Sequence, residues 1–310
     1  MTTPTGAIGG QHASRSGVVG RVRDVVALLK LRITTLVVIT SLGGMALAVR
    51  LGAVSSLSVR TAVIAVVGLS MVVTSANMLN MYLERDGDAL MERTRDRPLP
   101  SGRMNPSHAL WAAFVLAVLA LPVLAVGVNG LTAALAAWAL ALYAGFYTPL
   151  KRVTSQALLV GAVPGALPPL IGWTAATGEV ALPGLALFGV LFFWQIPHFL
   201  AIGTLHLDDY TRAGVKVFPA ERPMPVVRWH AMGHCLALIV VSLLLALPFG
   251  ELRGLGVGYF GVASLLGVGF LLAAAAPCDD AVAWAKRLFR SSLVYLTALF
   301  LCFGFAAWTP

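Results

Sequence analysis

The sequence predicts an all-α protein that crosses a membrane about nine times as one helical bundle. Of its 310 residues, 58% are hydrophobic and only 11% are charged, whereas a soluble domain usually has about 25% charged residues. The apolar residues gather in runs long enough for membrane-spanning helices, which need roughly 20 of them. We predict spans at Ile33–Val54, Thr61–Tyr82, Ala109–Val128, Leu131–Tyr147, Gln156–Thr174, Leu182–Thr204, Trp229–Pro248, Gly256–Ala276 and Ser291–Trp308.

The placement of the basic residues supports this number of spans. The formal net charge is +9. With the N-terminus inside, 19 of the 22 lysines and arginines fall on the inner side, and only Arg50, Arg60 and Arg253 fall outside. Inner loops of membrane proteins carry such an excess, so the charge reflects topology and does not indicate a nucleic-acid partner. We expect a cytoplasmic N-terminus and a C-terminus outside.

The rest of the chain adds few constraints. Residues 1–28 lack the apolar core of a signal peptide, and we expect a flexible cytoplasmic tail there, followed by one transmembrane domain over residues 29–310. The short N-terminus favours a bacterial inner (plasma) membrane. The three cysteines form no CxxC motif and imply no disulfide framework.

The acidic residues gather in two loops on the predicted inner side. The first loop follows the second span and holds Glu84, Asp86, Asp88, Glu92 and Asp96. The second follows the sixth span and holds Asp208, Asp209 and Glu221. Because the loops are four spans apart, they hint at a duplicated four-helix unit with an acidic site at the same end of each copy.

The first acidic segment has the spacing of a metal holder. Asn80, Glu84 and Asp88 are four residues apart, so they stack on one helix face at about 6 Å of rise per step. Two carboxylates at this spacing repel each other unless something positive lies between them. Mg²⁺ typically bridges one or two carboxylates to a substrate phosphate. Asn77 lies a turn below, near hydrocarbon depth, where polar residues are usually functional. We favour a Mg²⁺–diphosphate site over a solvated helix end.

A basic loop follows. Pro98 and Pro100 exclude a continuing helix, and Arg93, Arg95 and Arg97 would lie on one side of an extended chain. Guanidinium groups suit phosphate oxygens, although the loop alone is better explained as a topology anchor.

The second acidic segment allows two interpretations. Asp208 and Asp209 lie one helical turn before Arg212. They form either ordinary ion pairs at a wet helix end or a second metal holder with Arg212 and Lys216 on the diphosphate. The pairing with the first loop favours the second interpretation.

Three histidines lie within or at the edge of predicted spans. His198 follows a proline in the sixth span, where it would pack as a hydrogen-bonding group, ligate an iron such as that of haem, or move a proton. His230 and His234 lie on one face of the seventh span. Their spacing permits metal or haem ligation, but no third ligand is evident, so packing is favoured.

The fifth span is rich in proline, with Pro164, Pro168 and Pro169. Such prolines free backbone carbonyls that protein or water must satisfy, so we predict a broken helix that lines a cavity. Just before it, Tyr147 and Lys151 bring an aromatic ring and a cation to the inner side.

Together these motifs resemble the UbiA superfamily of intramembrane prenyltransferases, and within it most closely the branch that acts on haem. The similarity runs from about Leu29 to the C-terminus. The motifs are Asn80-x3-Glu84-x3-Asp88, Met91 to Gly102, Tyr147 to Arg152, Gly161 to Trp173, Trp194 to Phe199, and Asp209-Tyr-x3-Gly214. The arginine run and the Pro-His-Phe sequence are specific to the haem branch, whereas the acidic pair names only the superfamily.

The chain departs from the superfamily pattern in two places. The usual NxxxDxxxD motif has Glu84 as its first acid here, which preserves Mg²⁺ binding with altered reach. The second pattern, an Asp four residues before another, is missing, because Thr204 and Leu205 occupy those positions. The motifs therefore support the first metal site more strongly than the second.

The resemblance implies a helical bundle with a central cavity and one reaction. A farnesyl group passes from farnesyl diphosphate to a vinyl group of protohaem IX (haem B), water completes a hydroxyethylfarnesyl group, and haem O and diphosphate leave. This step serves haem-copper oxidase biogenesis. It implies Mg²⁺ as cofactor, the lipid bilayer as surroundings, and transient contact with haem A synthase or oxidase assembly factors.

The resemblance also implies site residues. The metal would be held by Asn80, Glu84 and Asp88, with Asp208 and Asp209 for a second metal. Asn80, Glu84, Asp88, Asp209 and Arg212 would form the catalytic set. The substrates would contact Arg93, Arg97, Lys151, Tyr147, Trp194 and His198.

Three other functions stay open from the sequence. A related enzyme would prenylate a quinone precursor. A transporter would also have broken helices, but its charges would lie at the midplane, whereas these acids lie at one face. A non-catalytic haem carrier would bind haem without needing Glu84 or Asp88.

Overall fold

The computed structural model describes residues 18–306, and every element within that range is a helix apart from one isolated β-bridge between Phe249 and Leu252. The elements are α1 (Val18–Leu29), α2 (Leu31–Arg50), α3 (Val59–Asp88), α4 (Pro106–Gly127), α5 (Gly130–Leu140), the π-helix η1 (Ala141–Tyr147), α6 (Thr148–Leu150), α7 (Ala157–Thr177), α8 (Leu182–Leu205), α9 (Leu207–Arg212), α10 (Phe218–Glu221), α11 (Met224–Leu244), α12 (Gly256–Ala275) and α13 (Ala281–Ala306).

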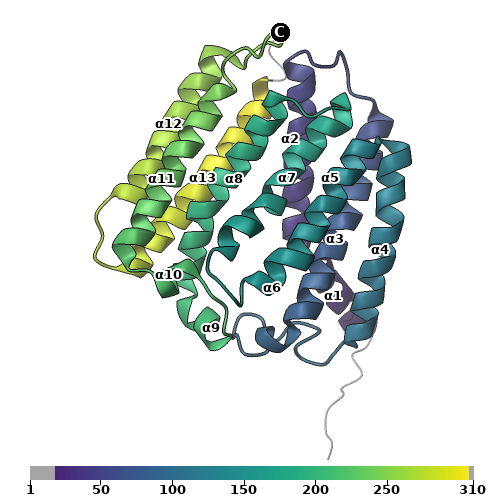
Figure 1. The fold of residues 1–310 in the computed structure, drawn as a ribbon, viewed down its shortest axis with the longest axis vertical. Helices are drawn as coiled ribbons and strands as arrows, with labels where there is room; N and C mark the ends of the chain where they lie inside the picture. Colours follow the sequence, from purple (N-terminus) through teal and green to yellow (C-terminus); the bar gives the residue numbers. More distant parts are fainter. Residues whose placement is uncertain (1–17, 307–310) are drawn as a thin grey trace, which may run out of the picture.

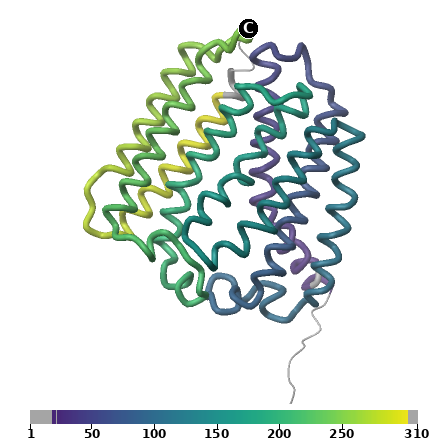
Figure 2. The backbone as a smooth tube through the Cα atoms, viewed as in Figure 1, coloured from purple at the N-terminus to yellow at the C-terminus, as the bar shows by residue number. Residues whose placement is uncertain are grey.

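The long helices form one bundle of roughly aligned rods (Figure 1). Within the described residues, eight helices are long and apolar enough to cross a membrane, and each overlaps one of the first eight predicted spans. The described part of the chain begins with α1 at one end of the bundle and reaches the opposite end with α13, which runs alongside α8 and α12 (Figure 2). The ninth predicted span matches α13 as far as residue 306, and its last residues lie outside the described range.

The prediction of a flexible tail up to residue 28 is wrong for residues 18–28. They belong to α1, which packs on α3 through the buried side chain of Leu28. Leu28 contacts the cluster that contains Met78 and Met81, so its burial stabilises the helix against the bundle. Residues 1–17, the remainder of the expected tail, lie outside the described residues.

The prediction of a broken fifth span is also wrong. Helix α7 is continuous from Ala157 to Thr177 and includes Pro164, Pro168 and Pro169. It is the most buried of the candidate spans, so its prolines are enclosed by protein, where they are tolerated in membrane helices. Gln195 of α8 also binds the helix backbone, because its Nε2 donates to the carbonyl oxygen of Ala162 at 3.3 Å.

Helix α7 packs unusually close to α2. A Cβ atom on Gly172 would lie 1.8 Å from the carbonyl oxygen of Ser41, and one on Gly44 would lie 2.0 Å from that of Pro169. Neither distance leaves room for a methyl group, so the two backbones approach only because both positions are glycine. Small residues serve this purpose at helix interfaces in membranes. The contact holds α2, and with it the α1–α2 junction, against the centre of the bundle.

We predict that Gly172→Val destabilises the protein by about 1–3 kcal/mol or more, because the new side chain would overpack this interface. The matched control is Gly269→Val on α12, where a Cβ atom meets nothing within 4 Å. Thermal unfolding in detergent measures both variants. An equal shift in Tm for the two valines would contradict the close α2–α7 contact.

Candidate functional site

The inner end of α3 carries two buried carboxyl groups. The helix continues through Gly87 to Asp88, so Asn80, Glu84 and Asp88 share one face, as the spacing predicts. All three are buried, with exposed fractions of 4%, 7% and 1% respectively. Ionised carboxylates at this depth are costly unless each has a compensating partner.

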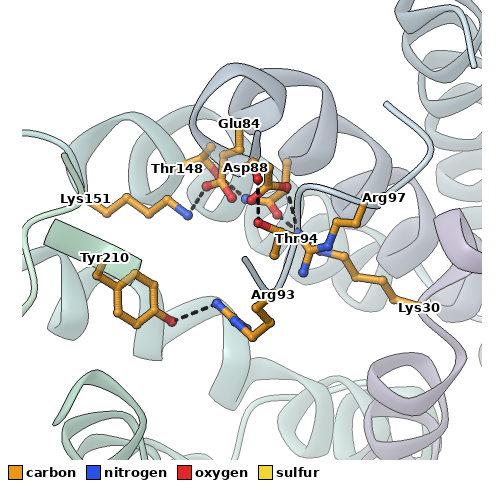
Figure 3. A network of polar contacts seen from close by, with 10 residues as sticks. Lys30, Glu84, Asp88, Arg93, Thr94, Arg97, Thr148, Lys151 and Tyr210 are labelled. Carbon is orange, nitrogen blue, oxygen red and sulfur yellow. Dashed lines mark hydrogen bonds and ion pairs between the residues drawn. The ribbon is translucent and has the colours of Figure 1, made fainter. Parts of the chain in front are cut away.

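Each of these side chains has a cation beside it (Figure 3). Lys151 forms an ion pair with Glu84. Arg97 Nη1 donates to Asp88 Oδ2 at 2.7 Å. Lys30 Nζ donates to Asn80 Oδ1 at 3.2 Å, and Asn80 Nδ2 in turn donates to Thr148 Oγ1 at 3.2 Å. The alternative of a solvated helix end is therefore wrong, because the carboxylates are enclosed and paired.

Lys30 is a site residue that the sequence analysis missed. It is the only residue other than glycine with a positive φ among the described residues, at 43°. This left-handed conformation is strained for a side chain with a Cβ atom, and such strain often accompanies a functional position. Burial, reinforced by the charge of Arg97, lowers the pKa of the Lys30 ammonium to about 8. A single lysine between two helices belongs to no sequence motif. Only its contact with Asn80 of α3 in the folded protein identifies Lys30 as part of the site.

The arginine loop is compact, which corrects the prediction of an extended chain. Backbone hydrogen bonds join Arg95 to Met91 and Arg97 to Thr94, so the loop runs as successive turns. Thr94 Oγ1 anchors it by donating to the carbonyl oxygen of Asp88 at 2.8 Å. Arg93 and Arg97 consequently line the same cavity, whereas Arg95 is exposed and is not among the residues that line it.

The segment after α5 brings Tyr147 and Lys151 to the same place. It contains the π-helical stretch η1, a distortion that often occurs at functional sites. Lys151 Nζ lies 5.7 Å from the centre of the Tyr147 ring. A Cβ atom on Gly161 of α7 would lie 2.4 Å from that ring. Because glycine has no such atom, the Tyr147 ring packs directly against the backbone of α7, which holds it in place.

The second acidic segment closes onto the first loop, so the two acidic loops do meet at one end of the bundle. Asp209 Oδ1 accepts from the backbone N–H of Glu92 at 3.4 Å and pairs with Arg212. The Arg212 hydrogen bond holds the pKa of the Asp209 carboxyl below its usual range. Arg93 Nη2 donates to Tyr210 Oη at 3.3 Å. Asp209 and Arg212 therefore join two loops, while Asp208 is exposed on α9 and is not in the cavity lining.

These elements enclose a cavity of about 280 Å³ at the inner end of the bundle. Two carboxylates and five cations line it: Glu84, Asp88, Lys30, Arg93, Arg97, Lys151 and Lys216. The excess of cations makes the cavity suitable for a ligand with several negative charges.

Asn80, Glu84 and Asp88 fit a Mg²⁺ ion. They offer one amide oxygen and two carboxylates on one helix face, the hard oxygen donors that Mg²⁺ prefers, and leave positions for phosphate oxygens and water. Within residues 18–306, no group of three or more His, Cys, Asp or Glu side chains gathers as a metal site. The second metal expected at Asp208 and Asp209 stays a prediction.

An apolar cavity of about 110 Å³ adjoins the charged one, and Ile33 lines both. Its other walls are mainly aliphatic side chains of α2, α3, α5 and α7, together with Tyr143 of η1. Asn77 also lines it, and its buried Nδ2 has no hydrogen-bond partner. The site therefore combines a polyanion pocket with an apolar extension into the bundle.

Two residues expected to bind substrate lie elsewhere. Trp194 Nε1 donates to the carbonyl oxygen of Ser292 at 2.7 Å. The ring of His198 lies between those of Trp194 and Phe289, at centroid distances of 4.7 and 4.9 Å, and its Nδ1 bonds Ser292 Oγ at 2.7 Å. Neither lines the charged cavity. They pack α8 against α13.

Comparisons with known proteins agree on one family. The model of the UbiA prenyltransferase family matches residues 37–293. A protein named protoheme IX farnesyltransferase from Sorangium cellulosum is 47% identical over 277 residues, which cover 86% of this chain and 98% of that protein. One of the same name from Myxococcus xanthus is 46% identical, covering 89% of this chain and 92% of that protein.

Solved structures share the fold at low identity. A digeranylgeranylglyceryl phosphate synthase aligns with a TM-score of 0.74 at 15% identity, covering 93% of this chain and 99% of its own. A UbiA homolog from Archaeoglobus fulgidus, solved bound to DMAPP and Mg²⁺, aligns with a TM-score of 0.61 at 14% identity, covering 88% of this chain and 98% of its own. The prediction of a UbiA-type helical bundle is confirmed.

We predict that Arg97→Ala weakens the binding of inorganic diphosphate by at least about tenfold, the effect of losing one charge-assisted hydrogen bond. Arg95→Ala is the matched control, since it removes the same charge from the same loop but outside the cavity. Isothermal titration calorimetry with Mg²⁺ present measures both affinities. Equal losses would mean that only the overall charge of the loop matters.

For Lys30, we predict that Lys30→Gly weakens diphosphate binding by at least about tenfold without lowering Tm. The binding loss follows from removing a charge-assisted contact. Stability is maintained because glycine adopts a positive φ without strain and removes a buried ammonium. Thermal unfolding and calorimetry on one preparation test both parts. A fall in Tm with unchanged affinity would identify Lys30 as purely structural.

Proposed function

The chain belongs to the UbiA prenyltransferase family, and on that basis we propose that it transfers a farnesyl group from farnesyl diphosphate to a vinyl group of haem B, giving haem O and diphosphate. The acceptor follows from the relatives at 45–47% identity, which are named protoheme IX farnesyltransferase. The observation that carries the proposal is the buried Asn80–Glu84–Asp88 face among five cavity-lining cations, beside an apolar cavity.

The diphosphate head would lie in the charged cavity. Asn80, Glu84 and Asp88 would hold Mg²⁺, which when bound supplies positive charge that stabilises the leaving diphosphate. Arg93, Arg97 and Lys151 would donate to its oxygens, as would Lys30 and Lys216. Such preorganised donors favour the departure because charge develops on the leaving group.

The pairs in Figure 3 suggest how the site accepts its ligand. Arg97 and Lys151 pair with the two carboxylates that would hold the metal, and Lys30 donates a hydrogen bond to the neutral amide of Asn80. With Mg²⁺ held by those oxygens, Lys30, Arg97 and Lys151 would be available to donate to the diphosphate. Arg97 and Lys151 would thus have an anionic partner both before and after the substrate binds, which matters because an unpaired buried charge is strongly destabilising.

The farnesyl chain would extend from the charged cavity past Ile33 into the apolar cavity. Its C1 atom would then lie near Tyr147, whose ring lines the charged cavity and can stabilise positive charge on the allyl group. The C1–O bond breaks with its electron pair leaving on diphosphate. C1 bonds one vinyl carbon of haem, and water adds its oxygen to the other vinyl carbon and releases a proton.

The apolar helices and the distribution of basic residues indicate where the protein resides and how it is oriented. The protein is an integral membrane protein with eight apolar helices long enough to span a bilayer among its described residues, and we propose a bacterial inner membrane with the charged cavity on the cytoplasmic side. The positive-inside distribution supports this orientation. Transient contact with haem A synthase or oxidase assembly factors would pass the product onward.

We predict that purified protein with haem B, farnesyl diphosphate and Mg²⁺ forms farnesylated haem, and that Asp88→Asn lowers the rate by at least about 100-fold, because it removes one of the two buried carboxylates that would hold the metal. Asp208→Asn, an exposed acid on α9, is the control and should keep nearly full activity. Mass spectrometry detects the product, and EDTA should abolish it.

Two outcomes would contradict the proposal. Full activity of Asp88→Asn would remove the metal-holding role from α3. Haem bound by the wild type without any product would favour a non-catalytic haem carrier, whereas product from a quinone precursor and none from haem would reassign the acceptor.

A further inference from the structure

We propose that the groove between α8 and α11 is a docking site for iron porphyrin, with His234 as the axial ligand of the iron through Nε2. This inference deepens the proposed function, on which it rests for the identity of the porphyrin. It assigns a place to the acceptor that is separate from the diphosphate cavity.

The groove lies at the surface of the bundle and has a volume of about 400 Å³. Its lining consists of Phe193, Trp229, His230, Gly233, His234 and Ala237. Trp229 is 70% exposed, and a Cβ atom on Gly233 would meet nothing within 4 Å. The groove is thus open at the surface of the bundle and offers aromatic and small side chains, which suit a large, flat, mostly apolar ligand.

The hydrogen bonding of His234 prepares it to bind a metal. Its Nδ1 lies 2.7 Å from the carbonyl oxygen of His230. A carbonyl oxygen only accepts, so Nδ1 carries the proton and Nε2 keeps its lone pair. Histidines that bind metals almost always donate their other ring N–H to a carbonyl or carboxylate in this way. His234 therefore has a fixed tautomer with a free ligand atom in an open groove.

The position of these histidines in α11 points to a functional role. Both lie in α11, one of the helices apolar enough to span a membrane. Their rings are stacked, with centroids 6.2 Å apart and an interplanar angle of 19°. Ionisable residues in a membrane span usually mark a functional site. The sequence favoured packing for His230 and His234, and the open groove that both line supports iron ligation as the alternative.

His198 is the rival ligand, and its surroundings are closed. Its ring lies between Trp194 and Phe289, and only 9% of the residue is exposed. Ser292 Oγ donates to the carbonyl oxygen of Phe289 and so accepts from His198 Nδ1. Although this also leaves Nε2 without a proton, His198 is buried between α8 and α13, whereas His234 lines a groove that is open at the surface.

The groove adjoins the charged cavity. The ring of His230 lies 4.6 Å, centre to centre, from that of Phe218, and Phe218 also lines the charged cavity. Phe218 therefore separates the two spaces, and a porphyrin held by His234 would lie next to the place where its vinyl group must react. Trp229 and His230 are in the first two turns of α11, close to the inner end where Arg222 is exposed and could receive a propionate.

The test is a titration of the full-length protein in lipid nanodiscs with ferric haem B, followed by the Soret band, with empty nanodiscs as baseline. His234→Ala should raise the Kd for haem at least tenfold and remove the spectral signature of imidazole ligation. His108→Ala, an exposed histidine at the start of α4, is the matched control and should leave both unchanged. Gly233→Phe, which would fill the groove, should also weaken binding.

Metal-free protoporphyrin IX provides the second probe, because it has the same shape without iron. Wild type and His234→Ala should bind it equally. Equal haem affinity of wild type and His234→Ala, or equal loss of both porphyrins in that variant, would overturn the proposal. The binding of farnesyl diphosphate should be the same in both proteins. If the wild type makes no product yet binds haem through His234, the docking site stands and the proposed function fails.

Discussion

The structure is organised around the burial of two carboxylates, Glu84 and Asp88, at the inner end of α3. A buried charge is strongly destabilising without a partner, and α3 cannot supply one from the same face. The cations come from the arginine loop and from the segment after α6, and Lys30 at the α1–α2 junction pairs with Asn80 beside them. Because each buried carboxylate needs a nearby cation, the fold brings the arginine loop, the segment after α6 and the α1–α2 junction together at the inner end of α3.

The same arrangement separates two environments within one site. Toward the inner surface the cavity is lined by cations, and toward the bundle interior it adjoins an apolar space. An amphiphilic substrate with a charged head and a hydrocarbon chain matches this division. Ile33 lies at the boundary because α2 is held tightly against α7, through the glycine contacts at Gly44 and Gly172. Packing deep in the bundle thus determines the shape of the polar site.

The loops on the inner side act as one unit. Asp209 and Tyr210 of α9 contact Glu92 and Arg93 of the arginine loop, so the two halves of the bundle meet over the cavity. On the far side of Phe218 lies the His234 groove. Two substrates, one a polyanion with an apolar chain and the other a porphyrin, would then approach a single aromatic boundary from opposite sides.

The sequence by itself determined the membrane helices, their order, and the alignment of Asn80, Glu84 and Asp88, because these depend on local hydropathy and on the 3.6-residue helical repeat. The motifs also led to the family. Only the tertiary structure decided which cations face the acids, why Lys30 belongs to the site and Arg95 does not, that α7 stays continuous through its prolines, and that His198 is enclosed while His234 is open. These outcomes depend on contacts between segments far apart in the chain, and a local pattern does not contain the distances between them.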